Sequence, residues 1–182
     1  MLRAAVTAIT VLAATSHADG EPAPSGRLGV ALQLGGASGV SGVAAIELDG
    51  AWRRSGATWL RAAIAGGVPV PDAGRVLEAR LGIEHRREDC GGGCLYLGVD
   101  LALATADVRD DPDQTTVRAA LVIPRLGLDA GSDTLRFRLG VELWLGAARA
   151  HDREPDVVPP VDATTTRWVT GFVVASGISA QF

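Results

Sequence analysis

The sequence contains no lysine and no asparagine, and aromatic residues make up only 4 % of its 182 residues. Without lysine the chain can form neither a Schiff base nor a P-loop phosphate site, because both need the lysine amine. Without asparagine it has no N-glycosylation site. The chain has 17 arginines and 21 acidic residues, and the resulting net charge of −4 argues against a general nucleic-acid binder. A hydrophobic fraction of 47 % is too high for a disordered chain.

The beginning of the chain has the three parts of a secretory signal peptide. Arg3 supplies a positive charge, residues 4–15 are apolar or threonine, and Ser16-His17-Ala18 places small residues before Asp19. We therefore expect a signal peptide over residues 1–18, a flexible lead-in over 19–25 and a folded part over 26–182. The apolar run is too short to span a bilayer as a helix, and no later run reaches the length of about 18 apolar residues that a membrane helix needs.

Alternation with a period of two dominates the remaining sequence. In residues 134–147 (TLRFRLGVELWLGA), the leucines, Phe137 and Val141 share one parity, while the arginines, glycines and Glu142 share the other. A helix would mix these two sets, whereas a strand separates them. The same pattern occurs in residues 27–35, 76–86 and 95–104, and more weakly in 42–53, 58–66, 115–127 and 168–182. Within 115–127, Pro124 and Arg125 predict a bulge or an early end.

These eight segments predict an all-β fold, an eight-stranded antiparallel up-and-down barrel. Every connection contains Gly, Pro, Asp or Ser, and no amphipathic helix lies between the strands. The connections also alternate in length, with outward loops expected at 36–41, 67–74, 106–114 and 147–166. Shorter turns are expected near 54–57, 87–94 and 128–133, as membrane barrels prefer.

The last strand carries a further signal. Residues Gly171–Phe182 form an alternating segment that closes with phenylalanine. With the signal peptide and the eight strands, it makes the sequence resemble the small eight-stranded outer-membrane β-barrel proteins of Gram-negative bacteria over essentially all of the chain after the predicted signal peptide, residues 19–182. The scarcity of aromatic residues departs from the aromatic girdles of such barrels.

The resemblance implies a transmembrane barrel in the outer membrane, surrounded by outer-membrane lipids, with a structural or surface-interaction role and loops exposed outside. It also implies that the barrel-assembly machinery recognises the last strand, through Phe172, Val174, Ile178 and Phe182. The alternative is a soluble periplasmic lipocalin-like barrel that binds an apolar ligand, with the leucine-rich rows facing inward.

Ten charged residues fall on the polar parity and are candidates for the barrel interior. They are Glu47, Asp49, Arg61, Glu78, Arg80, Glu84, Asp100, Arg136, Arg138 and Glu142. Buried charges must pair, so we expect them to form an ion network. Eight strands leave an interior largely filled by side chains, so an open pore is not expected; a proton or ion path is the alternative.

Two cysteines flank three glycines in Cys90-Gly-Gly-Gly-Cys94, at a predicted turn. An exported protein meets an oxidising environment, so the sequence predicts a Cys90–Cys94 disulfide, whose turn the glycines let close. The two thiols lack further partners for a metal site.

Candidate residues for enzyme chemistry are few. His85 and the His151-Asp152 pair have no nucleophile motif beside them, and the acidic segment 107–113 lacks the calcium-loop pattern. We therefore expect no enzyme, no metal and no cofactor.

Overall fold

The computed structural model describes residues 26–38, 40–70, 73–86, 93–110, 113–132, 134–154 and 161–182. The predicted signal peptide and lead-in, residues 1–25, lie outside them. The described chain forms eight strands: β1 (Gly26–Ala37), β2 (Val40–Ser55), β3 (Thr58–Pro69), β4 (Ala73–Arg86), β5 (Gly93–Asp110), β6 (Asp113–Gly131), β7 (Leu135–Glu154) and β8 (Val161–Gln181). Within this part of the chain no helix is long and apolar enough to cross a membrane.

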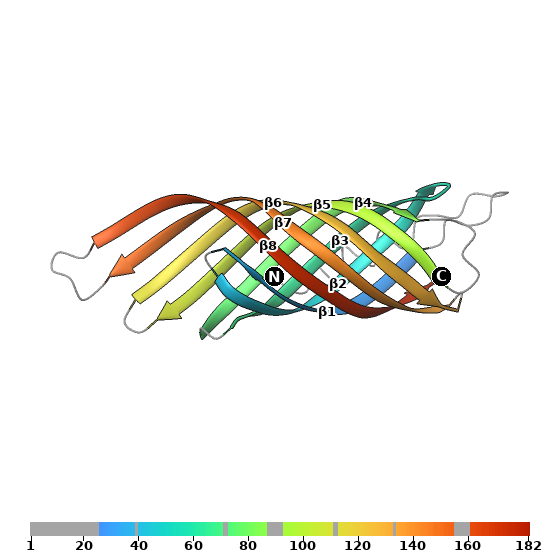
Figure 1. Ribbon diagram of the computed structural model, residues 1–182, viewed down its shortest axis with the longest axis horizontal. Coiled ribbons are helices and arrows are strands. Elements are labelled where there is room, and N and C mark those ends of the chain that lie inside the picture. Colours follow the sequence, from blue (N-terminus) through green and yellow to red (C-terminus); the bar gives the residue numbers. More distant parts are fainter. Residues whose placement is uncertain are drawn as a thin grey trace.

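The eight strands close into a barrel (Figure 1). Each strand pairs antiparallel with the next, and β1 pairs with β8 from Arg27–Gln181 to Ala37–Gly171. This closure satisfies the backbone groups that an open sheet would leave at its edges. The predicted all-β, eight-stranded antiparallel up-and-down barrel is therefore confirmed.

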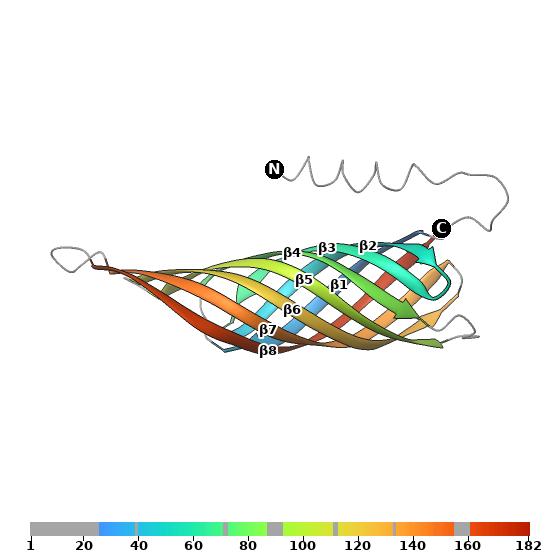
Figure 2. The same ribbon diagram turned by 90° about the horizontal axis from the view of Figure 1, so that it is seen from above.

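The two ends of the barrel differ in the length of their strands. We call the end where β1 begins and β8 ends the base. At the opposite end, β5 to β8 continue beyond the other strands, as both views show (Figures 1 and 2). We call residues 104–110, 113–121, 146–154 and 161–171 the far wall. There β5 stays paired with β6 to Asp110–Asp113, and β7 with β8 to Glu154–Val161.

Two predictions about strand length are wrong. Described residues of the predicted loops 106–114 and 147–166 belong to strands of the far wall. The sequence still alternates there, but its apolar rows break off, and this hides the strands from a search for alternating leucines. The bulge or early end predicted at Pro124 and Arg125 is also absent. The pairing with β7 skips Ile123 and Pro124, but β6 runs on to Gly131 and its register is the same at Val122–Leu145 and Arg125–Glu142.

Candidate functional site: the two halves of the barrel interior

A belt of exposed apolar side chains surrounds the barrel. On β7 the row from Leu135 to Leu145 lies on the outer face, with exposed fractions from 37 % to 58 %. On β5 the row from Leu95 to Leu103 also lies on the outer face, and the exposed fraction of Leu103 is 71 %. These rows have the length of about 9–11 residues that a transmembrane strand needs. Every strand contributes to the belt, including Leu32 of β1, Ile46 of β2, Val68 of β3, Leu81 of β4, Leu126 of β6 and Phe172 of β8.

Inside the base half of the barrel the side chains are charged. The described residues bury seven arginines and seven acids there, so the buried charges of this half balance. The arginines are Arg27, Arg61, Arg80, Arg86, Arg125, Arg136 and Arg138, and the acids are Glu47, Asp49, Glu78, Glu84, Asp100, Asp129 and Glu142. We call these 14 residues the charge network. All its cations are guanidinium groups, which can each bind several carboxylates.

Glu84 is a centre of the charge network. Its carboxylate accepts hydrogen bonds from Arg27 at 3.1 Å, Arg125 at 3.2 Å and Arg138 at 2.8 Å, and also from Arg86. Asp49 joins the same group, since it pairs with Arg27 at 2.7 Å and with Arg138 at 3.2 Å. These contacts link β1, β2, β4, β6 and β7 across the lumen.

Arg61 and Arg80 extend the charge network toward the middle of the barrel. Arg61 donates to Asp100 at 2.5 Å and also to Glu47. Arg80 pairs with Glu142 at 2.7 Å, and with Glu78 at 2.9 Å on its own strand. The cavity left among these side chains is only about 20 Å³, which is room for about one water molecule.

Tyr96 fills the remaining space beside the arginines. The Arg138 guanidinium carbon lies 4.5 Å from the centre of its ring. A Cβ atom at Gly127 or Gly140 would overlap the Tyr96 hydroxyl. Glycine at these two positions therefore makes room for the aromatic ring, and the base half is packed with side chains.

The structure places all ten predicted interior residues inside the barrel and brings them into this ion-paired cluster. Sequence reasoning missed four members, Arg27, Arg86, Arg125 and Asp129. Arg27 and Arg86 lie on the polar parity of their strands, so the signal was present in the alternation. Arg125 and Asp129 were assigned to a broken strand and a turn, but both face inward from the continuous β6.

The far half of the interior is apolar. A cluster of buried side chains, including Ala45, Ala102, Ile123, Trp144 and Val173, lies above the charge network and forms a floor. Trp144 joins the two regions, because the Arg80 guanidinium carbon lies 5.8 Å from its ring centre while the ring also lines the space beyond. That space is a cavity of about 320 Å³.

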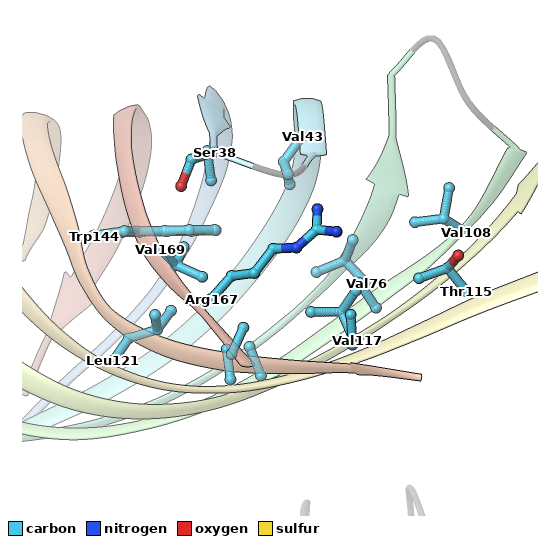
Figure 3. Close-up of a pocket in the computed structure, with 16 residues that line it drawn as sticks. Ser38, Val43, Val76, Val108, Thr115, Val117, Leu121, Trp144, Arg167 and Val169 are labelled. Carbon is cyan, nitrogen blue, oxygen red and sulfur yellow. The ribbon is translucent and has the colours of Figure 1, made fainter. Parts of the chain in front are cut away.

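Alanine and valine line most of this cavity (Figure 3). Its lining includes Val43, Val76, Ala106, Val108, Val117, Ala119, Leu121, Trp144, Ala148, Ala150 and Val169. Arg167 is the one charged residue of the lining. We call this space the far cavity.

The outer surface of the far wall is polar. One row across the wall joins Thr105, Arg118, Arg149 and Thr166 through successive strand pairs. The neighbouring row on the inner face joins Ala104, Ala119, Ala148 and Arg167. Along β5 to β8 the alternation therefore continues while its polarity inverts, from apolar outside and charged inside to polar outside and apolar inside.

The predicted assembly residues lie on the outer face of β8 and just beyond it. Phe172, Val174, Ile178 and Phe182 are 39–60 % exposed and belong to the apolar belt. Aromatic residues otherwise divide by parity: Trp168 is 82 % exposed near the boundary between the belt and the polar rows, whereas Trp59, Tyr96 and Trp144 are buried inside.

The cysteine pair is described only in part. Cys94 lies at the start of β5, and Arg136 Nη2 lies 3.7 Å from its sulfur. Cys90 lies outside the described residues, so the disulfide stays a prediction.

The residues considered as candidates for enzyme or metal chemistry in the sequence lie apart from one another. His85 faces outward from β4, and His151 lies beside the Thr164 hydroxyl at 3.2 Å on the far wall. Asp107, from the acidic segment, pairs with Arg75 at 2.7 Å on the outer surface. Among the described residues no cluster of histidine, cysteine and acidic side chains could hold a metal ion.

Three solved structures share this architecture. Neisserial surface protein A superposes with a TM-score of 0.61 at 10 % identity, covering 87 % of this chain and 96 % of that one. The N-terminal β-barrel domain of Pseudomonas aeruginosa OprF superposes with a TM-score of 0.58 at 9 % identity, covering 86 % of this chain and 97 % of that one. Outer membrane protein AlkL, studied in DMPC lipid bilayers, superposes with a TM-score of 0.62 at 11 % identity, covering 92 % of this chain and 94 % of that one.

At these identities the likeness concerns the fold alone: the chain has the fold of small eight-stranded outer-membrane β-barrels. No protein-family model matches the sequence, and no curated protein matches it.

Proposed function

We propose that the protein is an outer-membrane β-barrel with a structural or surface-interaction role. The observation that carries this proposal is the apolar belt. Leucine and phenylalanine side chains on all sides of the barrel are exposed, while 14 charged side chains are buried inside. In water this distribution would be very unfavourable, but in a bilayer it satisfies both faces of the sheet.

A soluble lipocalin-like barrel would need the opposite distribution. Its leucine-rich rows would point inward, around an apolar ligand. Here the Leu135–Leu145 row points outward, and the base half of the interior is ion-paired. The alternative is therefore not favoured.

The orientation follows from the position of the polar rows. Arg118, Arg149 and Thr166 cover the outer surface of the far wall, directly beyond the belt. Extended outer loops and short periplasmic turns are usual for such barrels. We therefore place the base at the periplasmic side and the far wall outside the cell, where it can meet surface partners.

The charge network supports a scaffold rather than a pore. Balanced guanidinium and carboxylate groups occupy the lumen, and the cavity among them, of about 20 Å³, holds about one water molecule. Ions crossing the barrel would have to separate these pairs. A non-catalytic role without a cofactor also remains part of the proposal; His85 and His151 both face outward, away from the buried carboxylates.

The last strand supports a further part of the proposal, recognition by the barrel-assembly machinery. Phe172, Val174 and Ile178 lie on one face of β8, interrupted by Ser176, and Phe182 follows just beyond the strand. Such a row is available to another protein until β8 joins the finished barrel, where lipid would cover it.

Cell fractionation and gel mobility test the membrane location. We expect the protein in the outer-membrane fraction, released only by detergent, with an electrophoretic mobility in SDS that changes on heating. Recovery in a wash without detergent, with no heat-modifiable mobility, would contradict the proposal.

A matched pair of arginine substitutions tests the position of the belt. Leu139→Arg places a charge within it and should cost about 2–4 kcal/mol in a bilayer. Thr166→Arg places the same charge on the exposed outer face of the far wall, where it should be tolerated. Equal stability of the two variants in bilayers would show that the belt does not contact lipid.

A further inference from the structure

The far cavity combines two chemical features that lie in separate places on most proteins. Its walls are alanine, valine, leucine and tryptophan, which suit an alkyl chain. Its volume of about 320 Å³ lies at the lower end of the range of small-molecule pockets, about 300–1,000 Å³. One strongly basic side chain, that of Arg167, projects among these walls (Figure 3).

The position of Arg167 follows from the register of the far wall. It ends a row of inward-facing residues whose other members, Ala104, Ala119 and Ala148, are all small. These methyl groups leave space above them for the long side chain. Figure 3 shows the guanidinium reaching from β8 into the space between Val43 and Val76.

Arg167 differs from the arginines of the charge network, because no acid among the described residues forms an ion pair with it. All seven network arginines pair with buried carboxylates, whereas no ion pair or hydrogen bond joins the Arg167 guanidinium to any other described side chain. Its planar group of five donors is suited to bind a carboxylate in a bidentate manner. Arg167 is exposed to solvent while its side chain lines the apolar walls, so an anion bound to its guanidinium would lie next to them.

The far cavity is open on one side of the far wall. The register of β8 with β1 ends at Ala37–Gly171, and Ser38 extends the seam through hydrogen bonds to Thr170 and to the Trp168 carbonyl. Within the described chain, the residues of β8 before Trp168 have no partner on β1. The outer surface around this opening carries the exposed threonines Thr164, Thr166 and Thr170, with the exposed Trp168 among them. In the proposed orientation this part of the wall lies beyond the apolar belt, so a ligand would enter from the surrounding water rather than from the bilayer.

We propose that the far cavity binds a water-borne, single-chain anionic amphiphile of the fatty-acid class. The alkyl chain lies against Val117, Leu121 and Trp144, and the carboxylate binds the Arg167 guanidinium. This binding site goes beyond the proposed scaffold role, because nothing in a structural barrel requires an apolar cavity with a single cation.

Quenching of tryptophan fluorescence by a brominated decanoate tests this site in the full-length protein reconstituted in phosphatidylcholine bilayers. Trp144 lines the far cavity, so bound bromine should quench it in a saturable manner. Decanoate should displace the brominated acid. Decanol and decyltrimethylammonium, which carry the same chain on a neutral and a cationic head, should compete at least roughly tenfold more weakly, as expected from the loss of one charge-assisted contact.

Two pairs of variants assign the site to its residues. Arg167→Gln should weaken decanoate binding by roughly tenfold, whereas Arg149→Gln, on the outer face of the same wall, should not change it. Ala119→Leu places a larger side chain in the far cavity and should reduce binding, whereas Ala120→Leu, directed outward on the same strand, should not.

Several outcomes would overturn the proposal. They are non-saturable quenching, equal competition by the three head groups, and unchanged affinity in Arg167→Gln. Displacement of the brominated acid by phosphatidylglycerol added to the bilayer would contradict a water-borne ligand. Heat-modifiable mobility, measured on each sample, separates these results from a failure of the barrel to insert.

Discussion

The two halves of the interior belong to one barrel but differ in chemistry and in packing. In the base half, seven arginines and seven acids fill the lumen, and about 20 Å³ remains among them. In the far half, small apolar side chains surround about 320 Å³. Trp144 lies between the two, against Arg80 on one side and the far cavity on the other.

The difference shows that alternation and polarity are separate properties of a strand. The pleat alone sets which residues share a face. The surroundings decide which face is apolar: in the proposed orientation, lipid outside the base half requires apolar residues there, and water outside the far wall requires polar ones. Arg149 and Leu145 both face outward from β7, yet they face different surroundings.

Removal of a central carboxylate from the charge network should have the largest effect. Glu84→Leu leaves four arginines, Arg27, Arg86, Arg125 and Arg138, without one of their partners. Breaking a buried ion pair costs about 3–5 kcal/mol, because the remaining charge stays desolvated. Urea unfolding in bilayers measures this loss. A loss below about 1 kcal/mol, the usual value for exposed pairs, would show that water reaches the network.

Overpacking of the base half should have the next largest effect. Gly140→Ala places a methyl group onto the Tyr96 hydroxyl, and we expect a loss of about 1–3 kcal/mol. Gly66→Ala is the control, since its added Cβ would meet only Leu77 Cδ2, at an ordinary contact distance of 3.6 Å. The comparison is made by unfolding both variants under the same conditions. Similar stability of the two would contradict tight packing around Tyr96.

A substitution at the boundary between the halves should reduce the stability less than the two changes above. Trp144→Phe keeps an aromatic ring at the floor but weakens its cation–π contact with Arg80, and we expect a loss of about 0.5–2 kcal/mol. Trp168→Phe is the control because Trp168 is exposed on the outer surface. Unfolding curves of both variants measure the difference, which should vanish if Arg80 does not contact the ring.

The smallest effect should come from an ion pair on the outer surface of the far half. Asp107→Asn removes the partner of Arg75, whose side chain is 73 % exposed. Exposed pairs contribute at most about 1 kcal/mol, so the variant should unfold almost as the parent does. A loss as large as that of Glu84→Leu would mean that the two halves do not differ in access to water.

The base half could be predicted from the sequence, whereas much of the far half could not. Unbroken rows such as Leu135–Leu145 identify both the strand and its outer face, and the opposite parity then places Arg136, Arg138 and Glu142 inside. At Leu121 and Ile123 the inward face of β6 is still apolar, and at Arg125 it becomes charged. This change within one strand looks like a broken pattern in the sequence.

The far cavity depends on contacts between strands that sequence alternation does not describe. Arg167 lies beside Ala104, Ala119 and Ala148 only because four strands are in register. The threonine-rich sequence around Arg167 does not indicate that Arg167 shares an inner face with alanines of three other strands. The extension of these strands was missed because the apolar rows end at the far wall. The position of Arg167 above the alanines, without an ion-pair partner among the described residues, can be found only from the register.

Thiol labelling at two positions of β6 tests the division of the interior most directly. Val117 and Ile123 share the inward face of this strand; Val117 lines the far cavity, and Ile123 is fully buried in the floor. In a variant with Cys90 and Cys94 replaced by serine, we would compare Val117→Cys with Ile123→Cys in bilayers, using a charged maleimide that does not cross membranes. We predict that Val117→Cys reacts rapidly and Ile123→Cys does not react. Comparable reaction at both positions would show that water passes the floor, and would contradict a sealed, charge-paired base beneath an open apolar cavity.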